Sequence, residues 1–243
     1  MKRDIQIFDL PEQTAEAVAD LIRETALSRQ QQGKHFNLAV SGGSTPRQLF
    51  QLLADEEYRN TIPWETVRFF WVDERCVVPT NAESNFGMTW DALLQYAFVP
   101  ANNVFRIKGE EVPEDEVQRY GKLLIAKLPA RNGHPVFDLI LLGMGDDGHT
   151  ASIFPDQMYL LEVDHPAAIA VHPVSGQKRI TLTGPTICNA DKVAFLINGQ
   201  SKAGLLREII NDEPSAQNYP AAHVYGHRRH IAFYLDKAAA SKL

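Results

Sequence analysis

Residues 137–155 read FDLILLGMGDDGHTASIFP, a short apolar run followed at once by a loop rich in glycine and charge. Such a run, polar only at Asp138, is typical of a strand buried on both faces of a parallel sheet. In an open α/β sheet, ligands bind beyond the carboxyl ends of the strands. This stretch therefore predicts a parallel α/β sheet and, in the loop after the strand, one edge of a binding site.

The same alternation of apolar strands and longer helical segments continues in both directions along the chain. We predict strands at 5–9, 36–40, 67–72, 137–142, 168–172, 178–183, 193–197 and 230–235, and helices at 11–32, 45–54, 84–96, 113–128 and 201–210. This order is typical of an α/β fold in which helices cover both faces of a mostly parallel sheet. Because no linker or repeat interrupts it, we expect a single α/β domain over residues 1–243.

The composition limits the classes of partner. The chain has 243 residues with 24 Lys+Arg against 30 Asp+Glu, a formal net charge of −6. Nonspecific binding to nucleic acid or to an anionic membrane needs a clustered positive field. No stretch reaches the ~18 apolar residues of a membrane span, and no export signal is visible. We expect a cytoplasmic protein that binds neither nucleic acid nor membrane, as a monomer or small homo-oligomer.

Two further features do not change this expectation. The only cysteines, Cys76 and Cys188, lie far apart and indicate neither a disulfide framework nor a cysteine-based zinc site. The chain ends in Ser241-Lys242-Leu243, which would indicate a peroxisome only in a eukaryotic source.

A second strand end suggests a phosphate site. The strand predicted at 36–40 is followed by Ser41, Gly42, Gly43, Ser44, Thr45 and Pro46, and then by a helix for which Thr45 would be the N-cap. The glycines allow close approach of a ligand, the hydroxyls can donate, and the free N–H groups of a helix start favour an anion. A plain strand-to-helix turn explains this segment alone equally well. It is not a P-loop, because no Gly-Lys-Ser/Thr follows.

Three charged residues, Asp73, Glu74 and Arg75, come directly after the apolar run at 67–72. Arg75 could hold a carboxylate or phosphate oxygen, with Asp73 or Glu74 positioning it or binding sugar hydroxyls. The alternative is a solvated turn.

The loop after residue 142 matches G-x-G-x-x-G but does not fit a dinucleotide site. Asp146 and Asp147 stand where a pyrophosphate needs donors, and Pro155 shortens the helix that the motif requires. The loop instead presents His149, whose imidazole can accept a proton from water and return it to a leaving group. Either Asp147 or Asp73 could orient the other ring nitrogen.

Three other segments carry candidate residues. Lys202, in the first turn of the helix at 201–210, could close a phosphate site from the opposite side, or could simply be solvated. Arg179 alternates with apolar neighbours in a strand, so we expect it to be exposed. We reject a metal site at His223, His227 and His230, since no acidic residue or cysteine is interleaved.

Taken together and in this order, the motifs resemble the 6-phosphogluconolactonase family over nearly the whole chain. They are LAVSGGSTP (38–46), FFWVDER (69–75), SN (84–85), FDLILLGMGDDGHTASIFP (137–155), RITLT (179–183) and NG-x-x-KA (198–203). The resemblance implies a Rossmann-like sandwich shared with glucosamine-6-phosphate deaminase. It also implies hydrolysis of 6-phospho-D-glucono-1,5-lactone to 6-phospho-D-gluconate in the oxidative pentose phosphate pathway, with no metal and no organic cofactor.

The resemblance assigns roles to the candidate residues. It makes His149 the catalytic base, supported by the carboxylates of Asp73 and Asp147. The phosphate loop falls on residues 41–45, with Lys202 as a phosphate ligand, and Arg75 and Arg179 would face the substrate. Our hypothesis is that His149 activates water for attack on the lactone carbonyl and then protonates the departing ring oxygen.

Two alternatives remain at this stage. A glucosamine-6-phosphate deaminase or related sugar-phosphate isomerase is disfavoured by Arg75 after Asp73-Glu74 and by the run at 150–155, which lacks a glutamate of that class. A non-catalytic sugar-phosphate sensor would have no use for a titratable group such as His149. The segment at 223–230 is richer in His and Arg than we expect of the lactonases.

Overall fold

The computed structural model describes residues 4–226 and 230–243. Within these residues seven strands form the main sheet, and every neighbouring pair in it is parallel. Their order across the sheet is β1 (Asp4–Phe8), β12 (Ile231–Asp236), β11 (Lys192–Ile197), β8 (Leu139–Leu142), β2 (Phe36–Val40), β3 (Val67–Trp71) and β5 (Val104–Phe105). The predicted mostly parallel α/β sheet is confirmed.

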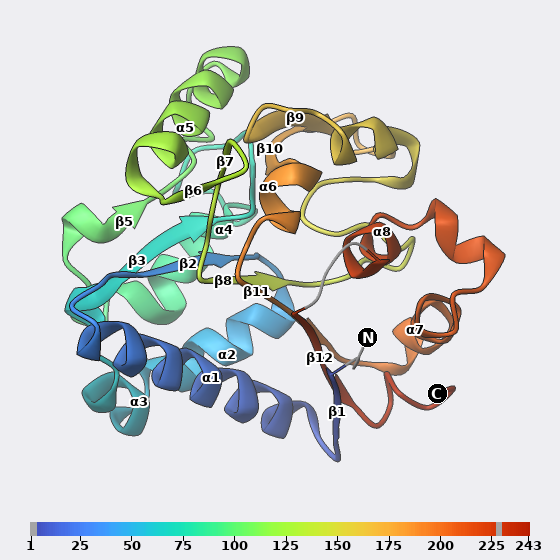
Figure 1. The fold of residues 1–243 in the computed structure, drawn as a ribbon, viewed down its shortest axis with the longest axis horizontal. Coiled ribbons are helices and arrows are strands. Elements are labelled where there is room, and N and C mark those ends of the chain that lie inside the picture. The colour runs from blue at the N-terminus through green and yellow to red at the C-terminus, as the bar shows by residue number, and fades with distance from the viewer. Residues whose placement is uncertain (1–3, 227–229) are drawn as a thin grey trace.

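Helices cover both faces of this sheet. They are α1 (Pro11–Gln31), α2 (Ser44–Ala54), α3 (Glu56–Thr61), α4 (Asn85–Thr89), α5 (Pro113–Lys127), α6 (Gly184–Cys188), α7 (Ala203–Ile210) and α8 (Pro220–Gly226). Figure 1 shows α1 and α2 on one side of the sheet and α5 and α6 on the other. Strands β2, β8 and β12 are buried along their whole length, which explains their nearly continuous apolar sequences. No helix in the described ranges is long and apolar enough to cross a membrane.

A smaller antiparallel sheet lies beside the main one. It consists of β4 (Asp73–Arg75), β10 (Lys178–Leu182) and β9 (Ala167–Val171), in that order. A short hairpin joins β9 to β10, and so short a connection permits only antiparallel pairing. Val72 connects the two sheets: its N–H donates to Val40 at 3.0 Å, and its carbonyl accepts from the Leu182 amide at 2.7 Å. Two strands of two residues each, β6 (Ala130–Arg131) and β7 (His134–Pro135), form a separate antiparallel hairpin.

Several element boundaries differ from the prediction. Helix α2 begins at Ser44, so the predicted Thr45 N-cap is wrong; Gly43 is the N-cap, with a φ of 111° that favours glycine. The helix predicted at 84–96 is a short α4 followed by a π-helical turn, Trp90–Leu94. A 3-10 turn, Gln200–Lys202, precedes α7. Further 3-10 turns are Trp64–Thr66, Ala101–Asn103, Pro155–Leu161 and Pro214–Asn218.

The strand order changes direction between β2 and β8. From β2 the chain proceeds outward through β3 to β5, whereas from β8 it proceeds through β11 to β12. The loops that leave the carboxyl ends of β2 and β8 therefore separate and leave a crevice, where open α/β sheets bind their ligands.

Candidate active site

A cleft of about 430 Å³ opens at this switch point. It is lined by the loops after β2, β8 and β11 and by residues of β4 and β10. The predicted site residues on its wall are Ser41, Gly42, Gly43, Ser44, Thr45, Asp73, Arg75, His149, Arg179 and Lys202. Asp147, the remaining one, contacts His149. The fold thus brings together residues from five separate segments of the chain.

His149 and Asp147 form a close pair. Asp147 Oδ1 lies 2.6 Å from His149 Nδ1 and also accepts the His149 backbone N–H at 3.1 Å. Burial alone would raise the pKa of the Asp147 carboxyl, but the hydrogen bonds from His149 outweigh it and lower that pKa to about 2. An ionised carboxylate only accepts hydrogen bonds, so Nδ1 is the donor of this bond, and in a neutral imidazole Nε2 would then carry the lone pair. Of the two predicted partners of His149, the geometry favours Asp147.

Two glycines of the loop make room for this pair. A Cβ on Gly145 would stand 2.1 Å from His149 Nδ1, so any side chain there would displace the imidazole. Gly148 has a φ of +80°, and a Cβ on it would meet the Tyr219 ring at 2.7 Å. The Gly148 carbonyl also accepts the Ala221 amide at 3.1 Å, which anchors the loop to α8. The glycines that resemble a dinucleotide motif therefore serve to position His149 beside Asp147.

The loop after β2 presents the first turn of α2 to the cleft. Gly43 and Ser44 are exposed, and the first amides of a helix have no carbonyl partner within it. Two residues of this loop also have contacts within the fold. The Ser41 hydroxyl is buried and donates to the Leu141 carbonyl at 2.8 Å, which links β2 to β8. Gly42 makes room for Asn85, whose Oδ1 would lie 1.7 Å from a Cβ at that position.

The acidic pair after β3 is not a solvated turn. Asp73 and Glu74 are 5% and 2% exposed and belong to β4. Glu74 accepts the backbone amides of Arg75, Asn85 and Phe86 at 2.7–2.8 Å and the Ser84 hydroxyl at 3.0 Å. Burial raises the pKa of the Glu74 carboxyl against the effect of these bonds. Glu74 therefore holds the start of α4 against β4.

Asp73 has different partners from those predicted. It accepts the Ser152 hydroxyl at 2.6 Å and the Asn85 side-chain amide at 3.3 Å, rather than orienting His149. Reasoning from residue chemistry missed two polar groups: Asn85 on the wall of the cleft and the buried Ser152, which contacts both Asp73 and Arg179. The only signals for them were their places in the SN and TAS runs, because each acquires its partner through tertiary contacts.

Arg75 and Arg179 stand opposite each other in the β4–β10 pair. The prediction that Arg179 is exposed is wrong, because its side chain turns into the cleft and lies 3.4 Å from Ser152 Oγ. Burial, and next the charge of Arg75, lower the pKa of the Arg179 guanidinium. Both Nε atoms are buried and find no partner in the described part of the chain. Two adjacent guanidinium groups of this kind suit an anionic ligand.

Lys202 is not a solvated lysine either. Its side chain is only 16% exposed, and Nζ lies 2.6 Å from Oδ1 of Asp146 in the glycine loop. The hydrogen bond from Lys202 is the main reason that the pKa of the Asp146 carboxyl is lowered. Lys202 thus lines the cleft from the segment after β11, and α2 begins after β2, the strand on the other side of β8.

The structure describes only part of the histidine-rich segment. His227, the middle member of the rejected metal site, lies outside the described residues. Within residues 4–226 and 230–243, no group of three or more His, Cys, Asp or Glu residues could hold a metal ion.

The fold and the cleft define an α/β protein with a crevice at a topological switch point, lined by the cationic side chains of Arg75, Arg179 and Lys202 and by a His–Asp pair. The sequence profile described as glucosamine-6-phosphate isomerases/6-phosphogluconolactonase matches residues 9–233, and the chain belongs to this family. The resemblance inferred from the motifs is confirmed.

Individual relatives agree with this assignment. The chain is 40% identical over 230 residues to 6-phosphogluconolactonase of Haemophilus influenzae, covering 95% of this chain and 97% of that one. It is 43% identical over 198 residues to 6-phosphogluconolactonase of Treponema pallidum, covering 82% of each. The prediction of an enzyme of the lactonase branch is therefore confirmed.

Solved structures extend the comparison to the fold. The structure of 6-phosphogluconolactonase from Trypanosoma brucei superposes with a TM-score of 0.88 at 29% identity, covering 100% of this chain and 99% of that one. A monomeric glucosamine-6-phosphate deaminase superposes with a TM-score of 0.83 at 19% identity, covering 99% and 100%. The second likeness shows a shared fold alone, as the motif resemblance implied.

Proposed function

We propose that this chain hydrolyses 6-phospho-D-glucono-1,5-lactone to 6-phospho-D-gluconate, with His149 as the general base. The contact that carries the proposal is the 2.6 Å approach of Asp147 Oδ1 to His149 Nδ1 in a cleft that also holds three cationic side chains. The names of the relatives support the substrate, since several of them are called 6-phosphogluconolactonase.

The cleft has separate regions for the two ends of such a substrate. The phosphate group would bind to the exposed amides at the start of α2 and to Lys202, which follow β2 and β11, the two strands that flank β8. Arg75 and Arg179 would face the lactone and its hydroxyl groups or share the anionic charge. This division would place the lactone carbonyl beside His149.

In the proposed reaction, His149 first accepts a proton and later returns it. His149 Nε2 takes a proton from a water molecule as the water oxygen attacks the lactone carbonyl, and the ionised Asp147 stabilises the resulting imidazolium. Cationic side chains or backbone N–H groups stabilise the oxyanion. As the carbonyl re-forms, the bond to the ring oxygen breaks, and the imidazolium returns the proton to that oxygen. None of these steps calls for a metal or an organic cofactor.

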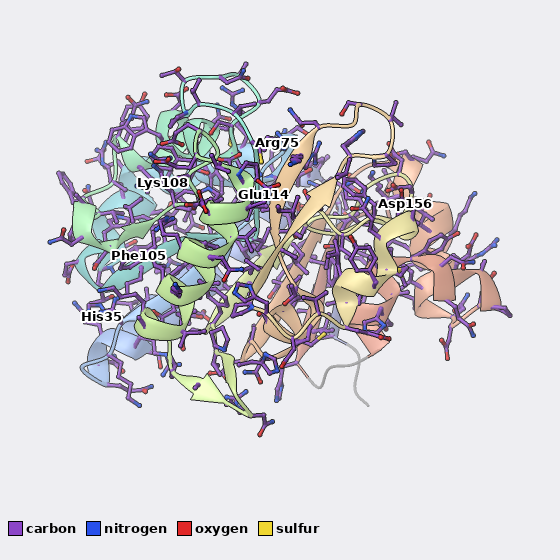
Figure 2. All side chains as sticks on the ribbon, turned by 90° about the horizontal axis from the view of Figure 1, so that it is seen from above. His35, Arg75, Phe105, Lys108, Glu114 and Asp156 are labelled. Carbon is purple, nitrogen blue, oxygen red and sulfur yellow. The ribbon has the colours of Figure 1, made fainter. Side chains whose placement is uncertain are left out.

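The test follows acid release from freshly generated lactone near neutral pH, against a blank without protein because the lactone also opens unaided. We expect a large acceleration that falls by about 10²–10⁴-fold in His149→Ala, the usual contribution of a general base. Binding of inorganic phosphate should change little. The matched control is His35→Ala, because His35 is exposed and lies well apart from Arg75 (Figure 2).

The results separate the proposal from its alternatives. Near-normal turnover in His149→Ala would refute the assignment of the base. No acceleration by the unmodified protein would refute the lactonase activity, and ammonia release from glucosamine 6-phosphate would then support the deaminase alternative. Sugar-phosphate binding with neither reaction would support a sensor.

A further inference from the structure

The ion pair between Lys202 and Asp146 joins two residues with very different exposure. The Lys202 side chain is 16% exposed, whereas that of Asp146 is 77% exposed, although both line the cleft. Lys202 stands at the end of a 3-10 turn before α7, and Asp146 lies in the loop after β8. The carboxylate therefore reaches the lysine from the solvent side.

A carboxylate in this place is unfavourable for an anionic ligand. Two like charges about 4 Å apart repel each other by ~1 kcal/mol even at the dielectric constant of water. Lys202 cannot offer the same N–H donors fully to Asp146 and to a phosphate oxygen. The mostly buried ammonium nonetheless needs a negative partner, and in this structure Asp146 supplies it.

We propose that Asp146 is an internal counter-ion that competes with the phosphate of the sugar phosphate for Lys202, and so sets the affinity of the cleft for anions. When the ligand binds, Lys202 exchanges the Asp146 carboxylate for phosphate oxygens, and Asp146 turns outward into solvent. Its high exposure leaves space for this movement. The inference rests on the proposed function, because it takes the phosphate group to bind at Lys202.

The arrangement would limit product retention. The proposed product carries a new carboxylate in addition to its phosphate, so it is more anionic than the lactone. A cleft that held such an anion with three unopposed cations would release it slowly. A competing carboxylate would lower the affinity for every phosphate-bearing ligand and keep Lys202 neutralised between turnovers.

The two adjacent aspartates would then have opposite roles. Asp147 binds His149 and would serve the reaction, whereas Asp146 binds Lys202 and would oppose ligand binding. The two roles can be tested separately, because the two aspartates have different contact partners and Asn is nearly the same size as Asp.

The test measures binding of inorganic phosphate and of 6-phosphogluconate by calorimetry at low salt. We expect Asp146→Asn to bind both ligands about 3- to 10-fold more tightly, in keeping with the modest strength of exposed ion pairs. The control for net charge is Glu56→Gln, an exposed carboxylate on α3, which should leave both affinities unchanged. In steady state, Asp146→Asn should lower KM and increase inhibition by the product.

A double-mutant cycle locates the effect at Lys202. Lys202→Ala should weaken binding of both ligands, and adding Asp146→Asn to it should then produce no gain. Unchanged or weaker binding in Asp146→Asn would overturn the proposal, because Asp146 would then merely hold Lys202 in place. An equal gain with and without Lys202 would also overturn it, since the effect would be a general one of charge.

These outcomes stay distinct from failure of the proposed function. If the protein does not open the lactone, the cycle with inorganic phosphate still reports whether Asp146 opposes anion binding at Lys202. If the lactone is opened but the cycle shows no coupling, only the counter-ion inference fails.

Discussion

A methyl group at position 145, in the same loop as His149, would occupy the space of the His149 imidazole. A Cβ on residue 145 would lie 2.1 Å from His149 Nδ1 and 2.8 Å from Asp147 Oδ1. Glycine is required here for space, since Gly145 is not among the residues with positive φ. The requirement belongs to a single residue, and a single substitution tests it.

We predict that Gly145→Ala lowers kcat by about 10²-fold or more, because the imidazole must leave its place beside Asp147. The matched control is Gly143→Ala in the same loop, where a Cβ would meet nothing within 4 Å. The measurement is kcat for lactone opening in both variants, with circular dichroism to compare their folds. Equal activity of the two variants would show that the imidazole position does not matter.

At the scale of elements, the short helix α4 depends on one buried carboxylate. Glu74 in β4 accepts the backbone amides of Asn85 and Phe86 at the start of α4, besides that of its neighbour Arg75. Ser84 caps the same helix by accepting the Gly87 amide at 3.0 Å. Asn85, the first residue of α4, then reaches Asp73 and the wall of the cleft. The positions of Asp73 and Asn85 on the cleft wall therefore depend on β4, a strand of three residues, and on α4, a helix of five.

We predict that Glu74→Ala lowers the free energy of unfolding by about 2–4 kcal/mol, because buried donors lose their acceptor. Urea denaturation measures this change. Glu83→Ala, which removes an exposed carboxylate from the following loop, should stay within about 0.5 kcal/mol of the unmodified protein. Equal stability of both variants would mean that water replaces Glu74 at α4.

At the scale of the whole molecule, the two sheets share one hydrophobic core. Val72 binds both of them through its backbone, and residues of the small sheet, among them Ile180 and Leu182, belong to the same hydrophobic cluster as the main sheet. Helix α5 packs against β9 and β10 of the small sheet. We therefore propose that the chain folds as one α/β domain.

We predict a single cooperative unfolding transition for the whole chain. Calorimetry and circular dichroism should give the same midpoint, with a calorimetric enthalpy equal to the van't Hoff enthalpy. Tryptophan fluorescence offers an independent probe, because Trp71 lies at the end of β3 next to the junction. Two separate transitions would show that the small sheet unfolds by itself.

Much of the fold could be predicted from local patterns. The strand at Phe36–Val40 was predicted with its observed bounds, and the neighbouring central strands were off by one or two residues. Strand β4 was missed because three charged residues do not resemble a strand; they form one only through pairing with β10. The π-helical turn at Trp90–Leu94 likewise has no local signature.

The sequence by itself determined the order of strands and helices, the loops at the strand ends and the residues that carry possible chemistry. These are local properties, since apolar runs, glycines and charged side chains can be recognised within a few positions. Only the tertiary structure decided their partners: Asp147 rather than Asp73 on His149, Asp146 on Lys202, and Arg179 turned inward. Asp73 and Ser152 are 79 positions apart, and such a contact exists only once the chain has folded.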